Sequence, residues 1–60
     1  MNIRTWLRAL DLKTHAAAFE ENAIDLLLLP DLTDDDLKTL GVAALGYRKK
    51  ILKAATVSVQ

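Results

Sequence analysis

The stretch from Leu45 to Val59 constrains the fold most, because it is the longest segment of the chain with helical periodicity. Its apolar residues recur at the spacing of one face of an α-helix: Ile51, Leu52, Ala55 and Val59. An apolar stripe of this length offers one common surface to several shorter elements. The sequence therefore predicts a long C-terminal helix on which the rest of the chain packs.

The same stretch begins with small and basic residues, in the order Gly46-Tyr47-Arg48-Lys49-Lys50. The helix dipole is positive at this end, so cations placed here do not stabilise the helix. We therefore interpret them as a surface that meets an anionic partner; the alternative is that they are only solvated. Gly46 also lowers helix propensity in the first turn. The expected benefit is a close approach, either by another element of the chain or by a partner.

Sixty residues predict a single domain, residues 1–60, that buries only roughly 60% of the surface of its unfolded chain. The absence of cysteine excludes disulfides and thiolate metal sites, and a single histidine, His15, excludes a histidine-rich zinc site. The core must therefore consist of apolar side chains. With two Gly and one Pro among many helix-forming residues, the composition indicates an all-α fold.

Two short helices are expected in the first third of the chain. The first covers residues 2–10, with Asn2 as its N-cap and Trp6 on its apolar face. The second covers residues 14–21, and Asn22 is expected to end it in a left-handed conformation.

Four consecutive leucines, Leu26 to Leu29, come next, and Pro30 is expected to stop their helical turn. One turn presents side chains on every side, so the four leucines do not all fit against one core. We expect Leu26 or Leu27 to be partly exposed and to belong to a contact patch. The alternative is a segment that the core wraps on all sides.

Thr33 and Asp36 have the spacing of a capping box, which predicts a helix that begins after Thr33. This helix carries Leu37 inward and ends at Gly41, where Val42 completes a Schellman motif with Leu37. The acidic triplet at its start could also bind a divalent cation. The capping box explains the triplet with fewer assumptions and the spacing of a calcium loop is absent, so no metal site is expected.

The net charge is zero, but the charges are segregated along the chain. Seven of the eight acids lie between Glu20 and Asp36, and no base lies among them. From Leu37 to the end there is no acid, and every charged side chain is positive. The chain is thus acidic in its middle and basic at its end, which predicts two complementary surfaces.

No catalytic or cofactor site is expected. The sequence shows no nucleophile with a neighbouring base, no set of metal ligands and no phosphate-binding loop, so an enzyme is not predicted and neither is a cofactor. No apolar run approaches the ~20 residues of a membrane span, and no secretory signal is visible. A cytoplasmic setting is therefore the expectation.

Several landmarks occur in an order and at a spacing typical of one family. They are Trp6-Leu7, Leu10-Asp11-Leu12, Phe19, Asn22, Ile24-Asp25, Leu32-Thr33, Asp36-Leu37, Leu40-Gly41-Val42, Gly46, Arg48 and Lys50-Ile51-Leu52. Together they resemble the SAM (sterile alpha motif) domain, over nearly the whole chain. The resemblance implies a compact bundle of five helices with a longer C-terminal helix. The sequences Asn22-Ala23-Ile24-Asp25 and Leu29-Pro30-Asp31-Leu32 are most similar to those of bacterial SAM domains, which often belong to nucleotide cyclases and other signalling proteins.

Two departures from the family pattern bear on the structure. Asp11 stands where the family often has Gly, which affects the packing beside the second helix. Ala43 stands where the family often has Ser or Thr, which leaves the last helix without a side-chain N-cap.

The resemblance implies a protein-interaction module, many of whose members associate head to tail through a mid-loop face and an end-helix face. The segregated charges agree with such a contact. The predicted mid-loop face comprises Glu21, Asp25, Leu26, Leu27, Asp31, Asp34 and Asp35. The predicted end-helix face comprises Gly46, Tyr47, Arg48, Lys49, Lys50 and Lys53. A single Leu26→Glu or Lys49→Glu change is expected to stop assembly without unfolding the domain.

The predicted partner is a second copy of the chain or another SAM domain, since the sequence does not separate self-association from hetero-association. A contact between two different surfaces builds an open helical polymer unless it closes into a ring. RNA-hairpin binding is the other class, through the basic residues Arg48, Lys49, Lys50 and Lys53. The zero net charge weighs against a nucleic-acid partner.

Overall fold

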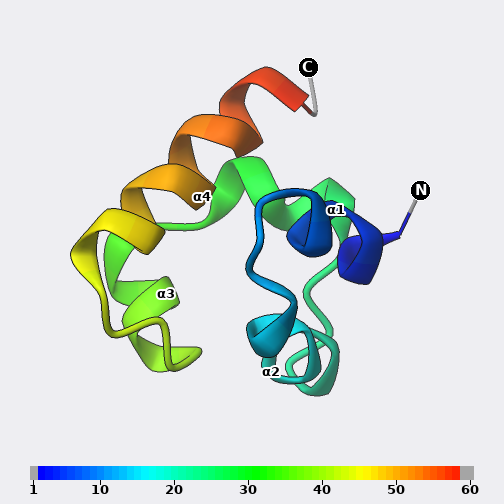
Figure 1. Ribbon diagram of the computed structural model, residues 1–60, viewed down its shortest axis with the longest axis horizontal. Helices are drawn as coiled ribbons and strands as arrows, with labels where there is room; N and C mark the ends of the chain where they lie inside the picture. Colours follow the sequence, from blue (N-terminus) through cyan, green and yellow to red (C-terminus); the bar gives the residue numbers. More distant parts are fainter. Residues whose placement is uncertain (1, 59–60) are drawn as a thin grey trace.

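The computed structural model describes the backbone of residues 2–58 and the side chains of residues 2–56 (Figure 1). Its elements are α1 (Ile3–Ala9), η1 (Lys13–His15), α2 (Ala16–Glu21), η2 (Leu26–Asp31), α3 (Asp34–Thr39) and α4 (Leu45–Ser58), where η denotes a 3-10 helix. Because α2 follows η1 without a break, the described residues form five helical segments, and all are helical rather than extended. The predicted all-α fold and long C-terminal helix are confirmed. Val59, the last residue of the predicted stripe, lies outside the described residues.

Side-chain caps fix the starts of α1 and α3. The Asn2 side-chain oxygen accepts a hydrogen bond from the Thr5 backbone N–H at 2.8 Å, which confirms the predicted N-cap. At α3 the Asp36 N–H donates to Thr33 Oγ1 at 3.1 Å, and the Thr33 N–H donates to Asp36 Oδ2 at 3.0 Å. The predicted capping box is therefore present, and it satisfies donors that the first turn leaves unpaired.

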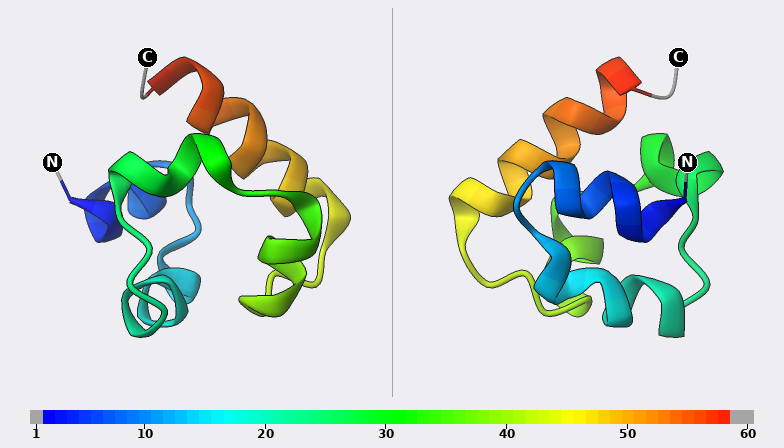
Figure 2. Two further views of the ribbon diagram at one scale, coloured as in Figure 1. Left: turned by 180° about the vertical axis from the view of Figure 1, so that it is seen from behind. Right: turned by 45° about the vertical axis from the view of Figure 1, so that its right-hand side comes forward.

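The long helix α4 lies along one side of the molecule, and the shorter elements pack beneath it (Figure 1). η2 and α3 both contact α4, and α1 contacts α2. Seen from behind, η2 crosses the front of the view, while α3 lies to one side with the start of α4 (Figure 2, left). No helix in the described range is long and apolar enough to cross a bilayer.

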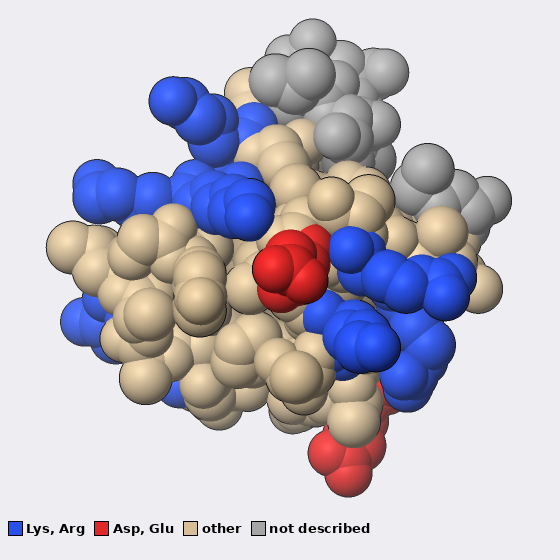
Figure 3. Space-filling model, viewed as in Figure 1, with Lys and Arg blue, Asp and Glu red and all other residues tan. Residues whose placement is uncertain are grey.

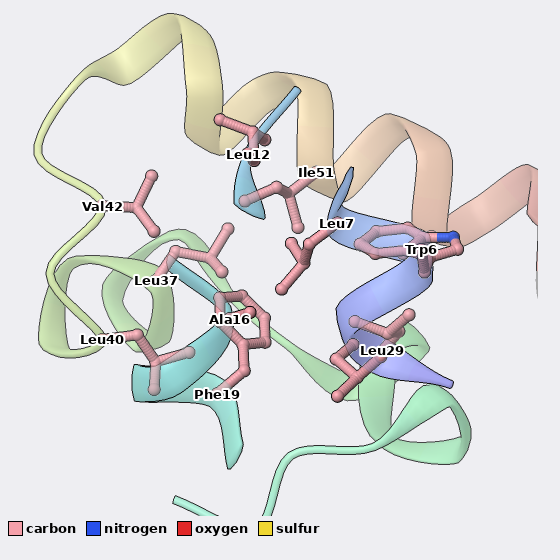
Figure 4. Packing of buried hydrophobic residues seen from close by; sticks show 12 residues of the cluster. Trp6, Leu7, Leu12, Ala16, Phe19, Leu29, Leu37, Leu40, Val42 and Ile51 are labelled. Atoms are coloured by element: carbon pink, nitrogen blue, oxygen red, sulfur yellow. The ribbon is translucent and has the colours of Figure 1, made fainter. Parts of the chain in front are cut away.

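One apolar core joins these elements (Figure 4). Its buried members are Ile3, Trp6, Leu7, Leu12, Ala16, Phe19, Leu29, Leu37, Leu40, Val42, Ile51 and Ala55. Ile51 and Ala55 supply the face of α4, which confirms the inward stripe of the last helix as far as the side chains are described. Figure 4 shows Phe19 and Leu37 pointing into the space between the helices, where they meet side chains from elements far apart in the sequence.

Helices α1 and α3 end in the same way, in a left-handed residue followed by an apolar residue that returns to the core. At the end of α3 the left-handed residue is Gly41, with φ of 93°, and the Val42 N–H donates to the Leu37 carbonyl oxygen at 3.0 Å. This is the predicted Schellman motif. At the end of α1 the left-handed residue is Asp11, with φ of 63°. The position explains why glycine is frequent there, since glycine adopts positive φ without strain.

Helix α2 ends in the same motif, but the predicted left-handed residue was wrong by one position. Asn22 has φ of −98° and is the C-cap, where its side-chain amide donates to the Ala18 carbonyl oxygen at 2.8 Å. Ala23 is the left-handed residue, with φ of 58°, and the Ile24 N–H donates to the Phe19 carbonyl oxygen at 2.8 Å. This register buries Phe19 and returns Ile24 to the core, and that gain outweighs the preference of asparagine for the left-handed region.

The leucine run forms the 3-10 helix η2, and Pro30 lies inside this helix rather than ending it. In a 3-10 helix each N–H bonds three residues back, so the ring of Pro30 removes only the bond to the exposed Leu27 carbonyl. The helix then closes with the Leu32 N–H donating to the Leu29 carbonyl oxygen at 3.2 Å. The expectation that Pro30 stops the turn was therefore wrong by one residue, since Asp31 is its last member.

An exposed ion pair links α1 to α2. The Arg4 guanidinium donates to both carboxylate oxygens of Glu20, at 2.6 and 3.3 Å. The hydrogen bond from Arg4 lowers the pKa of the Glu20 carboxyl below its ordinary value. Because solvent screens the pair, it orients the two helices more than it stabilises them.

We predict that Gly41→Ala lowers the free energy of unfolding by about 1 kcal/mol, because alanine is strained at this positive φ. The opposite change, Ala23→Gly, raises it by up to about 1 kcal/mol, because Ala23 already carries this strain. Urea denaturation of the two single variants measures both effects. Changes of the same sign would contradict the assignment of the left-handed positions.

Candidate interaction surfaces

The leucines of η2 divide between the core and the surface. In a 3-10 helix side chains three residues apart share one face, so Leu26 and Leu29 face the core together. Leu29 is buried and Leu26 packs half-buried against the core, whereas Leu27 is 81% exposed and Leu28 is 42% exposed. The expected exposed leucine is therefore Leu27, and the alternative of a fully wrapped segment is wrong.

Acidic side chains flank the two exposed leucines. Asp25 caps η2, where its Oδ1 accepts from the N–H groups of Leu27 and Leu28 at 3.0 and 3.2 Å. Glu21, Asp25 and Asp31 are exposed, and within the described residues they form no ion pair. We call Asp25, Leu27, Leu28 and Asp31 the acidic ridge. Glu21, which the sequence placed on the same face, is the last residue of α2 and belongs to a different element. The acidic ridge can bind a partner surface that is positively charged and has space for an apolar side chain.

The first turns of α4 carry the complementary surface. An open groove of about 530 Å³ is lined there by Gly46, Lys49, Lys50, Leu52 and Lys53, which we call the lysine groove. Its three lysines form a cationic rim, and the half-buried Leu52 adds apolar surface. The described part of the chain provides these lysines with no ion-pair partner. The groove therefore suits an anionic segment that carries an apolar side chain.

Gly46 leaves part of this groove open. A Cβ atom at Gly46 would meet no atom within 4 Å, once the neighbouring residues and the backbone of its own helix are set aside. Packing within the chain therefore does not require a glycine here. Of the two benefits expected from the sequence, close approach by another element is absent, and space for a partner remains.

Arg48 points into the molecule, although the sequence placed it on the end-helix face. It is 7% exposed, and its Nε donates to Asp34 Oδ1 at 2.8 Å. Its Nη1 donates to the carbonyl oxygens of Val42 and Ala43, at 3.1 and 2.7 Å. Arg48 thus offers little surface to a partner, because it is buried and its Nε and Nη1 groups donate within the chain.

The structure separates the predicted mid-loop residues into two places. Asp34 and Asp35 begin α3, where Lys38 approaches both carboxylates at 3.9 Å. Asp34 also pairs with Arg48, so it lies beside the start of α4 and not with the leucines of η2. Figure 2 (left) shows this separation, with η2 across the front and α3 at the side.

The acidic ridge and the lysine groove belong to different sides of the molecule. Most of the charged side chains on the face in Figure 3 are basic, and these lysines and arginines gather over α4 and over α1. η2 crosses the opposite side, as the view from behind shows (Figure 2, left). Two complementary surfaces placed in this way suit contact between copies rather than contact within one copy.

Sequence reasoning missed two exposed leucines. A helical period of three residues, which pairs Leu26 with Leu29, would have identified Leu28. Leu45, at the start of α4, is 54% exposed, and Tyr47, which the sequence placed on the end-helix face, is 50% exposed. Helical geometry places Leu45 about 120° from the inward Ile51, so its exposure was also predictable.

The rest of the described surface adds no second candidate centre. A hollow of about 260 Å³ is lined by Asn22, Ile24, Leu32, Asp36, Thr39 and Leu40. The Asp36 carboxylate is already used in the capping box. Within the described residues no three His, Asp or Glu side chains come together as a metal site.

Comparison with known proteins decides the family. A family model described as the SAM domain (sterile alpha motif) matches residues 1–57. The chain belongs to the SAM domain family. The resemblance inferred from the sequence is thereby confirmed, and members of this family are generally protein–protein interaction modules. No solved structure matches the chain.

Several curated proteins contain a similar SAM domain. "SH3 and multiple ankyrin repeat domains protein 2" of Homo sapiens is 42% identical over 53 residues, and "Protein bicaudal C" of Drosophila melanogaster is 43% identical over 53 residues. "RNA-binding protein VTS1" of Eremothecium gossypii is 39% identical over 56 residues. These matches cover 88%, 88% and 93% of this SAM domain but only 3%, 6% and 11% of the three relatives. The relatives are animal and fungal, so the bacterial subtype stays a prediction.

We predict that Gly46→Ala raises the free energy of unfolding by about 0.5 kcal/mol, because alanine is a better helix former and meets no neighbour here. Thermal unfolding at a concentration low enough to keep the domain monomeric measures the effect. Gly41→Ala, which acts in the opposite direction, is the matched control. A destabilising Gly46→Ala change would mean that the start of α4 needs a glycine for its own packing.

Proposed function

We propose that this SAM domain self-associates head to tail, with the acidic ridge of one copy seated on the lysine groove of the next. The observation that carries the proposal is the exposed Leu27 among carboxylates on one side of the molecule, and the lysine-rimmed groove on another. Such a contact joins two different surfaces, so each end of a dimer keeps one unused surface. Association then continues into a helical polymer, unless the rotation closes a ring.

Apolar burial supplies much of the affinity of this contact. Full burial of the Leu27 side chain contributes about 2 kcal/mol, and Leu28 adds to it. The opposite charges raise the association rate and fix the orientation of the two copies. Added salt screens charges beyond a Debye length of about 8 Å at physiological ionic strength, so salt is expected to weaken the contact without abolishing it.

The open space at Gly46 supports the same contact. A partner side chain can approach the backbone of α4 there, and the positive end of the helix dipole faces the incoming carboxylates. A methyl group at this position would occupy part of the groove. Gly46→Ala is therefore expected to weaken association even though it stabilises the single copy.

We predict that Leu27→Glu and Lys49→Glu each weaken association by about tenfold or more, because each removes one side of the contact. Sedimentation velocity across a concentration series, at low and high salt, measures the effect. Leu27 is the test position in place of Leu26, because Leu26 packs against the core and a charge there would damage the fold. A mixture of the two variants should form a discrete pair, since each variant keeps one intact surface.

Matched controls separate the contact from a general effect of charge. Ala17→Glu and Lys13→Glu introduce the same side chain at exposed positions of α2 and η1, outside both surfaces. Both controls are expected to associate like the unmodified domain. The assignment is wrong if Leu27→Glu and Lys49→Glu associate like the unmodified domain, or if the controls are weakened equally.

A second candidate function is the binding of an RNA hairpin by the lysine groove, which the similarity to the RNA-binding protein VTS1 favours. Lysines around a helix start can contact phosphates. Arg48, which the sequence counted among these contacts, is held by Asp34 instead. Fluorescence anisotropy with a labelled RNA hairpin tests this function. Binding that falls with salt and with Lys49→Glu would support it, and no change in anisotropy would exclude it for that hairpin.

The same surfaces would serve a different SAM domain as the partner. A domain that stays monomeric at every concentration yet forms a pair with another SAM domain would indicate hetero-association. In a longer parent protein, either form of assembly would raise the effective concentration of the attached domains. We place such a parent among cytoplasmic signalling proteins, where clustering of attached domains serves as a signal.

A further inference from the structure

Arg48 joins three parts of the chain. Its Nε donates to Asp34 at the first residue of α3, and its Nη1 donates to the carbonyl oxygens of Val42 and Ala43 in the linker before α4. Arg48 itself belongs to the first turn of α4. One buried side chain thus ties the start of α3, the linker and the start of α4 together.

The start of α4 depends on these bonds, because it has no side-chain cap of its own. The carbonyl oxygen of Ala44 accepts from the N–H groups of Tyr47 and Arg48, at 3.1 and 3.2 Å, which places Ala44 at the N-cap. An alanine side chain has no acceptor for the unpaired N–H groups of the first turn. Ala43 and Ala44 are also exposed, so little packing holds the linker. The guanidinium of Arg48 therefore fixes the linker relative to the first turn of α4.

The Asp34 carboxylate interacts with two cations of its own chain, Arg48 and Lys38. Its Oδ1 accepts a hydrogen bond from the Arg48 Nε at 2.8 Å, and its Oδ2 lies 3.9 Å from the Lys38 Nζ. A charge-assisted hydrogen bond of this length is strong, and it fixes the carboxylate toward Arg48, although the Asp34 side chain stays 41% exposed. The neighbouring Asp35 differs, since its side chain is 93% exposed.

We propose that Arg48 and Asp34 are positioning residues of the lysine groove. They hold the first turns of α4 against α3 in the orientation that the acidic ridge of the next copy recognises. Asp34 thereby serves the groove of its own copy, and not the acidic surface on which the sequence placed it. This inference rests on the proposed head-to-tail contact and identifies the residues that orient one side of it.

The test uses two backgrounds that each keep one working surface. The Leu27→Glu copy keeps the lysine groove, and the Lys49→Glu copy keeps the acidic ridge. Isothermal titration calorimetry of one background into the other measures a single contact without polymer formation. Thermal unfolding of every variant alone confirms that it is folded.

Asp34→Asn in the Leu27→Glu copy is expected to weaken the pair by about tenfold, because the groove loses a charge-assisted hydrogen bond that orients it. The same change in the Lys49→Glu copy is expected to leave the dissociation constant unchanged. Arg48→Lys should reproduce this difference, because lysine keeps the charge but lacks the planar fork that reaches three acceptors. A general loss of stability would weaken both pairs alike, so the difference between the two copies is the informative quantity.

Asp35→Asn is the matched control, since it removes the same charge one residue away. It is expected to leave the pair unchanged when it is placed in the Leu27→Glu copy. Equal weakening by Asp34→Asn in both copies would overturn the inference, and so would no weakening in the Leu27→Glu copy. If the two unmodified backgrounds form no pair at all, the head-to-tail contact itself is wrong.

Discussion

Burial of apolar side chains against the face of α4 is the interaction on which the rest of the structure depends. A chain of sixty residues without cysteine has no disulfide to limit its unfolded state, so its core must offset the conformational entropy of folding. Each preceding helix is too short to be stable alone. The left-handed residues at the ends of α1, α2 and α3 turn the chain at once, which lets every short helix return an apolar side chain to the same core.

The features of the fold that were predictable from the sequence are those set by neighbouring residues. The cap at Asn2 and the capping box at Thr33 each involve residues three positions apart, so the spacing alone identifies them. The end of α2 was not predictable in the same way. Local propensity favours Asn22 as the left-handed residue, but the burial of Phe19 decides the register and places Ala23 there. Pro30 was misjudged because its effect depends on the type of helix around it.

The candidate surfaces also show that contacts between distant residues were not predictable from the sequence. Segregated charge and the leucine run pointed to the two surfaces, and the exposure of Leu27 follows from the number of leucines in one turn. The pairing of Asp34 with Arg48 joins residues fourteen positions apart, and no periodicity relates them. The sequence therefore assigns too many charged residues to both surfaces, because Asp34 and Arg48 pair with each other within the chain. The acidic ridge and the lysine groove are therefore smaller than the two faces predicted from the sequence, and leucines and lysines are their main residues.

The leucine run has a consequence for the chain before it folds. Leu26 to Leu29 form a short uncharged apolar run, and apolar surface of this kind favours association between chains when an unfolded chain exposes it. Asp25 stands directly before the run, and Pro30 and Asp31 stand directly after it. A charge or a proline at these positions opposes the stacking of extended strands between chains. The residues that begin and end η2 in the folded domain are therefore also placed as gatekeepers, and we expect them to limit association through the leucine run during synthesis and refolding.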